Sequence, residues 1–469
     1  MSSVSGDEWG LEALPSSLPA KEIGAYKSGY SRAASFEKMI RDMNQEFELR
    51  YIGKPFKKED KKVEEAITNK IQKNIQLLKN FHNRLPAIGY YEELLSSSFR
   101  IDELKKAKED GKKVVGVFCN FVPEELLYAA ELIPIRLCAG AYDTIYPAEE
   151  ILPRDICPLI KSSIGFKLLR LSYFELCDLV IIPTTCDGKK KLGEILNSFV
   201  PVWLLEIPNR KNLQKAKDFW LIEVKALQKR LEEFTGNKIT RQRLKQAIQT
   251  LHKRQSIFRR FYELRKCNPG LINCRDTFLV IQATFYDEIN RWIEKTQELC
   301  TQFEQFSISN RKDLNSCIRL LLTGAPIIWP NYKLLNIIEG NDAIVIADEL
   351  CSGTRMLYDP VEVDEWTQEA MITGIAYRYL LPSTCPCFTE SNDRIDRLLD
   401  LVAEFKIEGV IYHSLRLCQL YDIEFYKVKQ VLKDKGVLLL NIHTDYSQED
   451  TEQIKTRVEA FLEMIRSKR

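Results

Sequence analysis

Cysteine is the residue with the greatest capacity for chemistry in this sequence, because the chain of 469 residues contains 13 of them. The number is odd, so the cysteines cannot all form disulfide pairs. In a reducing cytosol, that many thiols indicate metal binding or redox chemistry rather than a disulfide framework. Six thiols stand out by their place along the chain, and we predict that they are metal ligands: Cys119, Cys157, Cys186, Cys351, Cys385 and Cys418.

The six candidates are placed by short apolar runs, which we predict to be buried parallel strands. Four runs begin at Val114, Ile133, Leu179 and Val202, and four more begin at Arg319, Ala343, Gly409 and Val437. Ligands of open α/β sheets gather at the carboxyl ends of the strands. Each candidate cysteine follows such a run or lies in a loop or helix start between runs, so three thiols from each sheet could line a common cleft.

Residues beside the candidate cysteines favour a ligand role. Prolines at positions 123, 158 and 386 make the turns rigid. Gly188 and Gly353 would let the backbone approach a bulky inorganic cluster. Helix starts are also predicted after Cys157 and Cys186, where backbone N–H groups would stabilise the negative charge of thiolate or sulfide.

A structural zinc site is the main competing interpretation, but such sites draw their ligands from close CxxC or HxxxH pairs. The one close pair of cysteines is Cys385 and Cys387. The four histidines form no metal-ligand pair in the sequence: His82, His252, His413 and His443. Dispersed thiolates instead favour an iron–sulfur cluster that is buried at a domain interface and assembled from several loops.

The remaining cysteines are interpreted against the ordinary role of a lone cysteine, that of a small buried hydrophobic residue. Five lie in or beside predicted helices and keep that interpretation: Cys177, Cys267, Cys274, Cys300 and Cys317. Cys138 ends a predicted strand and Cys387 could substitute for Cys385, so both stay open as alternative ligands.

The elements that must position these thiols divide the chain into four parts. We predict a helical N-terminal extension over residues 1–110, including an amphipathic helix from Lys61, a first α/β domain over 111–213, a helical segment over 214–310 and a second α/β domain over 311–469. The predicted fold class is therefore α/β, with two open parallel sheets and helices before and between them.

Composition narrows the function classes. The net charge of +2 gives no field that would attract nucleic acid or an anionic membrane, so neither is predicted as a partner. The N-terminus lacks a basic and then apolar leader, and no run of about 18 apolar residues occurs, so we expect a cytoplasmic protein. The nucleotide-binding patterns GxGxxG and GxxxxGK[ST] and the GxSxG elbow are absent.

Several segments together resemble the 2-hydroxyacyl-CoA dehydratase and benzoyl-CoA reductase family, in order from about Lys113 to the C-terminus. They are FCNFVPEELLYAAELIPIRL from Phe118, LPRDICPLIKSSIG from Leu152, PTTCDGKKKLGEIL from Pro183, ADELCSGTR from Ala347, GVIYHSLRLCQLYD from Gly409 and TRVEAFLEM from Thr456. The resemblance implies two flavodoxin-like α/β domains with a helical portion, which agrees with the division above.

The resemblance also implies a cofactor. Subunits of this family typically hold a single [4Fe–4S] cubane through three cysteines, which are matched here by Cys157, Cys186 and Cys418. A related branch, the double-cubane cluster proteins, holds two cubanes joined by a bridging sulfide through six cysteines in each chain of a homodimer. This sequence is closer to that branch, because it adds three further thiols at suitable places: Cys119, Cys351 and Cys385.

The resemblance finally implies an activity and partners. The expected function is a reductase with a double-cubane [8Fe-9S]-type cluster, which receives electrons from a separate ATP-hydrolysing [4Fe–4S] activator and reduces a small molecule. One alternative is a subunit of a 2-hydroxyacyl-CoA dehydratase or benzoyl-CoA reductase, with one [4Fe–4S] cluster, an acyl-CoA substrate and a heterodimer partner. The other is a non-catalytic cluster carrier. Charged residues near the loops could move protons or bind anions, although such residues usually face solvent: Glu124, Glu125, Lys161, Lys189 and Arg355.

Overall fold

The computed structural model describes residues 58–469 apart from residues 80–83, 172, 269–270, 310–316, 342 and 358. The first 57 residues of the predicted extension, and His82, therefore lie outside the described residues. All residues from Phe56 onward belong to one unit, so the two sheets can be described together.

The first sheet is formed by the four apolar runs predicted in the first half of the chain. Its strands are Val114–Val117 (β1), Ile133–Arg136 (β2), Leu179–Pro183 (β3) and Val202–Leu205 (β4). They lie in the order β2-β1-β3-β4, and every neighbouring pair is parallel. All residues of the central strands β1 and β3 are buried, as expected for strands that helices cover on both faces.

The second sheet repeats this arrangement with the four later runs. Its strands are Ile318–Gly324 (β5), Ala343–Glu349 (β6), Gly409–Leu415 (β7) and Leu438–Thr444 (β8), in the parallel order β6-β5-β7-β8. In each sheet the chain moves outward in both directions from two central strands, so the switch points lie between β1 and β3 and between β5 and β7. Ligands of open parallel sheets bind at such points. All eight predicted strands are thus confirmed.

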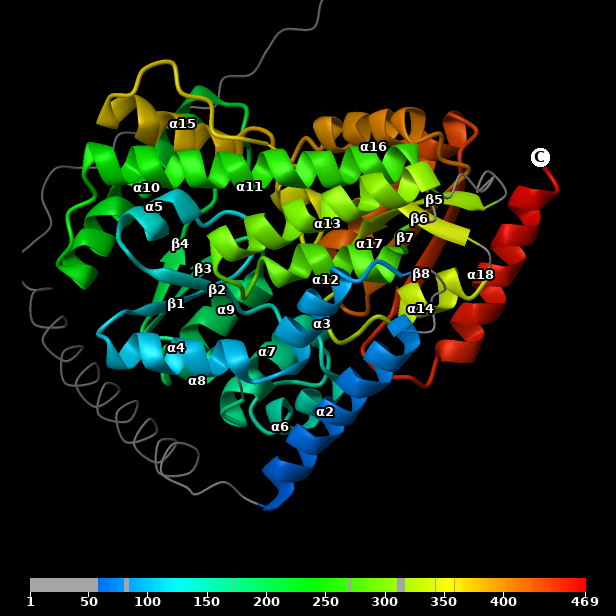
Figure 1. The fold of residues 1–469 in the computed structure, drawn as a ribbon, viewed down its shortest axis with the longest axis horizontal. Coiled ribbons are helices and arrows are strands. Elements are labelled where there is room, and N and C mark those ends of the chain that lie inside the picture. Colours follow the sequence, from blue (N-terminus) through cyan, green and yellow to red (C-terminus); the bar gives the residue numbers. More distant parts are fainter. Residues whose placement is uncertain are drawn as a thin grey trace, which may run out of the picture. The chain divides into compact units, whose positions relative to one another are not determined.

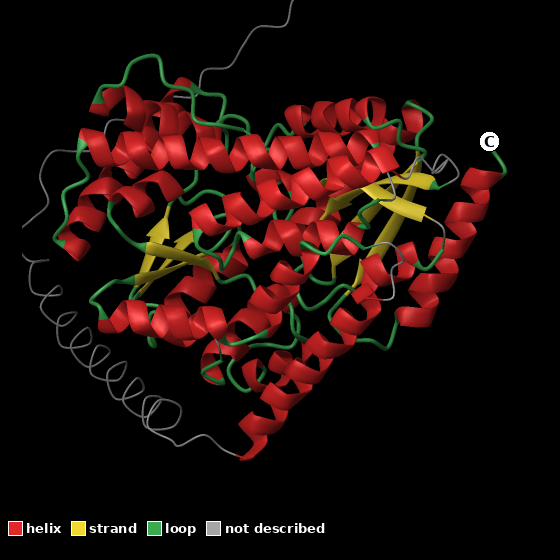
Figure 2. Cartoon of the chain, viewed as in Figure 1, coloured by secondary structure: helices red, strands yellow, loops and turns green. Residues whose placement is uncertain are grey.

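Helices and short turns connect the strands, as parallel pairing requires (Figure 2). Those of the first domain are Glu124–Ala129 (α5), Tyr142–Thr144 (η2), Ile145–Ala148 (α6), Pro158–Leu168 (α7), Tyr173–Leu176 (α8) and Asp187–Leu196 (α9). Those of the second domain are Lys333–Glu339 (α14), Thr354–Met356 (η3), Gln368–Leu380 (α15), Asn392–Glu404 (α16), Gln419–Asp434 (α17) and Thr451–Arg466 (α18).

The middle of the chain is helical, as predicted (Figure 1). It consists of Gln214–Thr235 (α10), Arg241–Cys267 (α11), Cys274–Ala283 (α12) and Ile289–Ser309 (α13). Gly236 ends α10 with a left-handed φ of 72°, a conformation that glycine adopts without steric cost. The side chains of Thr240 and Asn273 accept hydrogen bonds from the first turns of α11 and α12, which satisfies backbone donors that a helix start leaves free.

Helix α11 connects the two α/β domains through two buried arginines. Arg254 forms an ion pair with Glu124 of α5 in the first domain. Arg265, near the end of the same helix, donates a hydrogen bond of 2.9 Å to the carbonyl oxygen of Val345 in β6 of the second domain. One helix therefore contacts elements of both domains.

The N-terminal helices of the described part are Lys58–Lys79 (α2), Ile88–Ser96 (α3) and Phe99–Glu109 (α4). The amphipathic helix predicted from Lys61 is confirmed by α2. No described helix is long and apolar enough to cross a membrane.

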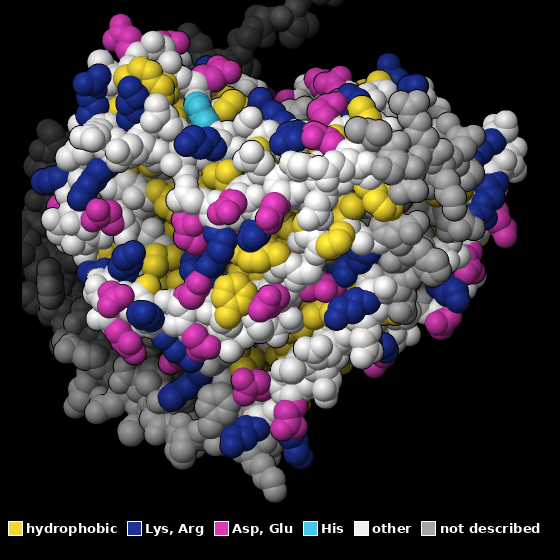
Figure 3. Space-filling view, viewed as in Figure 1, with side chains coloured by type: hydrophobic (Ala, Val, Ile, Leu, Met, Phe, Trp, Pro, Cys, Tyr) yellow, Lys and Arg dark blue, Asp and Glu magenta, His cyan; other side chains and the backbone are white. Residues whose placement is uncertain are grey.

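The hydrophobic core runs across both domains. One continuous cluster of buried side chains contains Val114 and Val180 of the first sheet together with Leu320 and Val410 of the second. On the face in Figure 3 acidic and basic groups are interspersed, which agrees with the small net charge of the chain.

Candidate metal centre

The structure places the six candidate cysteines at strand ends, helix starts and one loop. Cys119 and Cys351 follow β1 and β6 by two residues, and Cys385 lies in the loop between α15 and α16. The other three are the N-cap residues of α7, α9 and α17: Cys157, Cys186 and Cys418. All 13 cysteines of the chain are free thiols.

Three of these thiols, Cys157, Cys186 and Cys418, interact with one another and are called the first trio. The Cys418 thiol donates a hydrogen bond to the Cys157 sulfur, so the pKa of Cys157 is lowered and that of Cys418 is raised. Cys186 interacts electrostatically with both of them, and burial raises its pKa. The trio contains two thiols of the first domain and one of the second.

The other three thiols, Cys119, Cys351 and Cys385, are called the second trio. Cys351 interacts electrostatically with Cys119, and desolvation raises its pKa to about 12. A hydrogen bond with Cys387, followed by the charges of Arg355 and Lys189, lowers the pKa of Cys385 to about 6. Cys387 in turn interacts with Cys119. This trio contains one thiol of the first domain and two of the second, so each trio spans both domains.

Lys189, on α9, lies between the two trios. Its ammonium group donates a hydrogen bond to the sulfur of Cys119 and lies 3.3 Å from the hydroxyl oxygen of Thr185. Burial alone would lower the pKa of Lys189, but the neighbouring thiols of Cys119, Cys186 and Cys138 raise it. The group therefore carries a positive charge among sulfur atoms, where thiolate or sulfide charge would otherwise be uncompensated.

A strained backbone conformation occurs at a ligand candidate of the second trio and directly before a ligand candidate of the first trio. Cys119 itself has a φ of 57°, and Leu417, which precedes Cys418, has a φ of 64°. A residue with a side chain adopts this left-handed conformation at a cost of roughly 1–2 kcal/mol. Such strain concentrates at functional sites, where surrounding structure holds it in place.

A buried network of charges holds the segments that carry the second trio. Glu349, the last residue of β6, pairs with Arg394 and accepts hydrogen bonds of 2.8 and 2.6 Å from Arg355. It also accepts a hydrogen bond from the hydroxyl of Thr384, the residue before Cys385. Burial alone would raise the pKa of Glu349, but the two arginines lower it. The carboxylate thus joins the loop of Cys385 to the strand that leads to Cys351.

The turn that contains Cys351 is shaped by Asp348. Its carboxylate accepts hydrogen bonds of 3.2 Å from the backbone N–H of Leu350 and 2.9 Å from that of Thr354. A Cβ atom on Gly353 would lie 1.9 Å from Oδ1 of Asp348. In this structure the lack of a side chain on Gly353 gives room to the Asp348 carboxylate, and the approach of its backbone to a cluster stays a prediction.

The charged residues singled out near the loops do not face solvent, because each forms an ion pair or a hydrogen bond or is buried. Glu124 pairs with Arg254, and Lys161 lies 2.9 Å from Glu149. Glu125 is 1% exposed, and its Oε2 has no hydrogen-bond partner among the described residues. Burial raises the pKa of Glu125.

The cysteines outside the two trios fall into different classes. Cys138 is buried and interacts electrostatically with Lys189 and Cys119. Cys387 forms a hydrogen bond with Cys385. Both alternative ligands named in the sequence analysis therefore lie at the same centre as the two trios. Cys177, Cys274 and Cys300 are buried packing residues, as predicted, and Cys317 is partly exposed. Cys267 contradicts the packing interpretation because it is exposed at the last position of α11.

The donor set fits a polynuclear group better than a single ion. Within the described part of the chain, no three His, Cys, Asp or Glu side chains are placed to hold one metal ion. In a cubane each thiolate binds an iron of its own, so its ligands are spread around the cluster. Of the described histidines, His413 is buried with Nδ1 2.8 Å from the carbonyl oxygen of Ala325, and burial lowers its pKa to about 4.

Sequence reasoning missed two tyrosines at the centre. Tyr421 interacts electrostatically with Cys351 and Cys385. Tyr446 interacts electrostatically with four thiols. The available signal was position, since Tyr446 follows β8 at the same sheet edge as the ligand candidates, but no motif distinguishes it from an ordinary core tyrosine.

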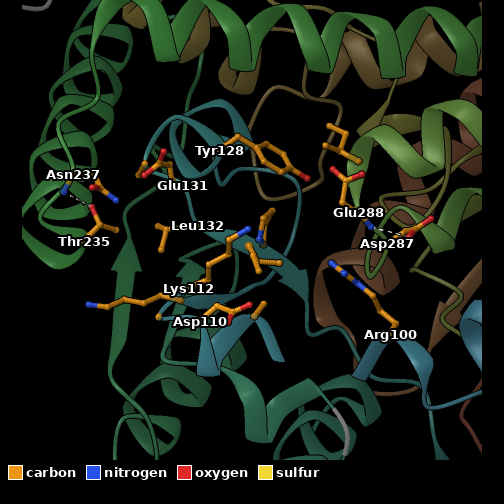
Figure 4. A pocket seen from close by; sticks show the side chains of 17 residues that line it. Arg100, Asp110, Lys112, Tyr128, Glu131, Leu132, Thr235, Asn237, Asp287 and Glu288 are labelled. Carbon is orange, nitrogen blue, oxygen red and sulfur yellow. Dashed lines mark hydrogen bonds between the residues drawn. The ribbon is translucent and has the colours of Figure 1, made fainter. Parts of the chain in front are cut away.

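A cavity of about 550 Å³ lies at the opposite edge of the first sheet (Figure 4). It is lined by residues that precede β1 and β2, among them Lys112 and Glu131, and by Tyr128 and Asp287. Because ligands of open sheets bind at the carboxyl edge, the cavity does not belong to the thiol centre.

Thiols gathered at the carboxyl edges of two open parallel sheets define an α/β protein with a thiol-rich centre. Residues 119–465 match the family model described as 2-hydroxyglutaryl-CoA dehydratase, D-component. The chain belongs to this family, whose members are iron–sulfur proteins and subunits of enzymes of the lyase or oxidoreductase kind. The sequence resemblance to 2-hydroxyacyl-CoA dehydratases and benzoyl-CoA reductases is thereby confirmed.

Individual relatives cover most of the chain. The Escherichia coli (strain K12) protein YjiM, provisionally named as a dehydratase subunit, is 34% identical over 362 residues, which are 76% of this chain and 93% of YjiM. The (R)-phenyllactyl-CoA dehydratase beta subunit of Clostridium sporogenes is 22% identical, with 77% and 94% covered. The beta subunit of (R)-2-hydroxyglutaryl-CoA dehydratase from Acidaminococcus fermentans is 24% identical, with 77% and 95% covered.

Among solved structures, the SBP FpvC of Pseudomonas aeruginosa with Ni²⁺ aligns at a TM-score of 0.20 and 12% identity, covering 76% of this chain and 98% of that one. A likeness at this score carries no argument about fold or function.

Proposed function

We propose that this chain is a low-potential iron–sulfur reductase that holds a double-cubane, [8Fe-9S]-type cluster through the six thiolates of the two trios. The observation that carries the proposal is the gathering of six ligand candidates around Lys189 in two sets of three. Three thiolates can bind three irons of a cubane. Each trio would thus hold one of the two cubanes.

The cluster, when bound, supplies single electrons at low potential. The residues of the chain do the rest: Lys189 keeps a positive charge beside the sulfur of Cys119, and Glu349 with its two arginines holds the segments of Cys351 and Cys385. The hydrophobic core that continues across both domains packs against Cys157 and Cys418, and apolar surroundings strengthen charge interactions.

The proposed electron donor is a separate ATP-hydrolysing activator with its own [4Fe–4S] cluster, and the proposed assembly is a homodimer that acts on a small molecule. Membership of a family of dehydratase and reductase subunits supports a partner protein in general. The absence of the common nucleotide-binding patterns from this sequence is consistent with ATP hydrolysis in another chain.

Iron and sulfide quantitation after anaerobic purification tests the proposal. We expect about eight irons per chain, on the reasoning of two cubanes with three thiolates each. Replacing any one thiol of the second trio, as in Cys119→Ser, Cys351→Ser or Cys385→Ser, should lower the iron content by about half while the first trio keeps its cubane. The buried packing thiol variant Cys300→Ser is the matched control and should retain all iron.

Two results would contradict the double-cubane assignment. One is about four irons in the wild-type chain, and the other is unchanged iron in all three variants of the second trio. Activator-dependent reduction of a substrate separates a reductase from a non-catalytic cluster carrier, which would hold iron without turnover.

A second candidate is the iron–sulfur subunit of a 2-hydroxyacyl-CoA dehydratase or benzoyl-CoA reductase, with one [4Fe–4S] cluster on the first trio. The names of the relatives favour it, because they include beta subunits of two acyl-CoA dehydratases and a benzoyl-CoA reductase subunit from Thauera aromatica. Co-purification of a homologous but different chain, together with consumption of a 2-hydroxyacyl-CoA in an activator-coupled assay, would identify this function.

A further inference from the structure

One buried side chain at the thiol centre has a hydrogen-bonding group that nothing in the described part of the chain satisfies. Tyr446 is 1% exposed, and its phenol oxygen has no hydrogen-bond partner among the described residues. Buried tyrosine hydroxyls are usually bonded, because a buried polar group without a partner destabilises the fold. The unpaired hydroxyl of Tyr446 is therefore available to form a hydrogen bond with a bound ligand.

The surroundings of Tyr446 identify the chemistry of that ligand. Its strongest electrostatic neighbours are four thiols: Cys157, Cys138, Cys418 and Cys351. Cys157 and Cys418 belong to the first trio and Cys351 to the second, so Tyr446 lies near ligand candidates of both trios. A phenol hydroxyl can donate a hydrogen bond to such a sulfur atom.

The turn that carries Tyr446 is held in place on both sides. The ammonium group of Lys333 lies 2.7 Å from the hydroxyl oxygen of Thr444 and 2.7 Å from the carbonyl oxygen of Ser447. It also pairs with Asp450, and all of these groups are buried. The unpaired hydroxyl is thus part of a fixed structure, so its lack of a partner does not come from a loosely held side chain.

We propose that the hydroxyl of Tyr446 donates a hydrogen bond to a sulfur atom of the iron–sulfur cluster, an inference that rests on the proposed function above. Reduction adds negative charge to the sulfur atoms, and a donor stabilises the reduced cluster more than the oxidised one. The bond therefore raises the reduction potential of the cluster and sets how strong a reductant the loaded protein is.

The Tyr446→Phe variant tests the proposal, because it removes the hydroxyl and keeps the ring. We expect wild-type iron and sulfide content and a midpoint potential more negative than that of the wild type, measured by a redox titration followed by electron paramagnetic resonance. Tyr332→Phe is the control: Tyr332 is also buried, but its hydroxyl already lies 3.3 Å from Oε1 of Gln282. This variant should leave the potential unchanged.

A further variant, Tyr446→His, restores a ring donor and should bring the midpoint potential back toward that of the wild type. Loss of iron in Tyr446→Phe with retention in Tyr446→His also supports the donor role. An unchanged potential in Tyr446→Phe, or loss of iron in both variants, would overturn the inference by assigning the ring to packing alone. Failure of the proposed function has a different signature, since the wild type itself would then contain about four irons or none.

Discussion

The two trios differ in the groups that place positive charge beside their sulfur atoms. Every thiol of the first trio is the N-cap of a helix, so the positive ends of α7, α9 and α17 point toward its sulfur atoms. The second trio has no such helix starts and instead lies beside the cations of Lys189 and Arg355. Backbone dipoles are built into a fold and need no side-chain partner, whereas buried cations must be balanced by a network such as that of Glu349.

The largest expected effect comes from replacing Glu349, which balances the cations beside the second trio. Replacement by Gln leaves the guanidinium groups of Arg355 and Arg394 buried beside a neutral side chain. We expect a loss of about 3–5 kcal/mol in the free energy of unfolding, as for other broken buried pairs, measured by urea denaturation. The exposed pair of Arg210 and Glu390 is the control, and Glu390→Gln should change stability by less than about 1 kcal/mol. A small effect of Glu349→Gln on the free energy of unfolding would show that the buried cations beside the second trio do not need this carboxylate.

The next effect concerns β7, the strand that leads to Cys418 in the first trio. Burial lowers the pKa of His413 to about 4, while its pKa in the unfolded chain is about 6.5. The unfolded chain therefore binds a proton first as pH falls. Stability is fully present above about pH 6.5 and decreases by up to about 3 kcal/mol as pH falls toward 4.

His413→Gln should remove this part of the acid sensitivity, measured as the free energy of unfolding between pH 7 and pH 4. His443, which is partly exposed, serves as the control, and His443→Gln should retain the slope. Equal slopes in the wild type and in His413→Gln would show that His413 carries no such penalty.

A smaller effect tests the strained backbone before Cys418. Asn tolerates the left-handed region better than Leu, and Leu417 is 46% exposed, so little packing is lost. We expect Leu417→Asn to be neutral or to stabilise the metal-free protein by up to about 1 kcal/mol. Leu417→Val should destabilise it, because a β-branched residue is strained there. Thermal unfolding of the two variants gives the comparison, and the reverse order would contradict the assignment of strain.

The smallest effect is expected at a thiol outside both trios. Cys267 is exposed at the end of α11, so Cys267→Ser should change the free energy of unfolding by no more than about 0.5 kcal/mol. It should also leave the iron content of anaerobically purified protein unchanged. A fall in iron would mean that the division of cysteines into ligands and others is wrong.

All eight strands could be predicted from the sequence, because buried parallel strands are short continuous apolar runs, whereas the helices show charged residues at regular intervals. The sequence also predicted that thiols would gather at strand ends, which follows from the geometry of open sheets. The division into two trios was predicted only from the resemblance to a known family and not from spacing, since Cys418 comes near Cys157 and Cys186 through the placement of one domain against the other. The burial of Glu124 was equally hidden, because its partner Arg254 lies 130 residues away.

Helix α11 has a consequence for the assembly of the centre. Its 27 residues span about 40 Å at 1.5 Å per residue, and its two buried arginines are bound to different domains. A hinge motion that separated the domains would leave at least one of these guanidinium groups buried without its partner, which is costly. If the centre holds the proposed cluster, iron and sulfide would therefore have to reach the thiols through local movement of loops, such as the loop of Cys385, which is tied to the carboxylate of Glu349 through Thr384.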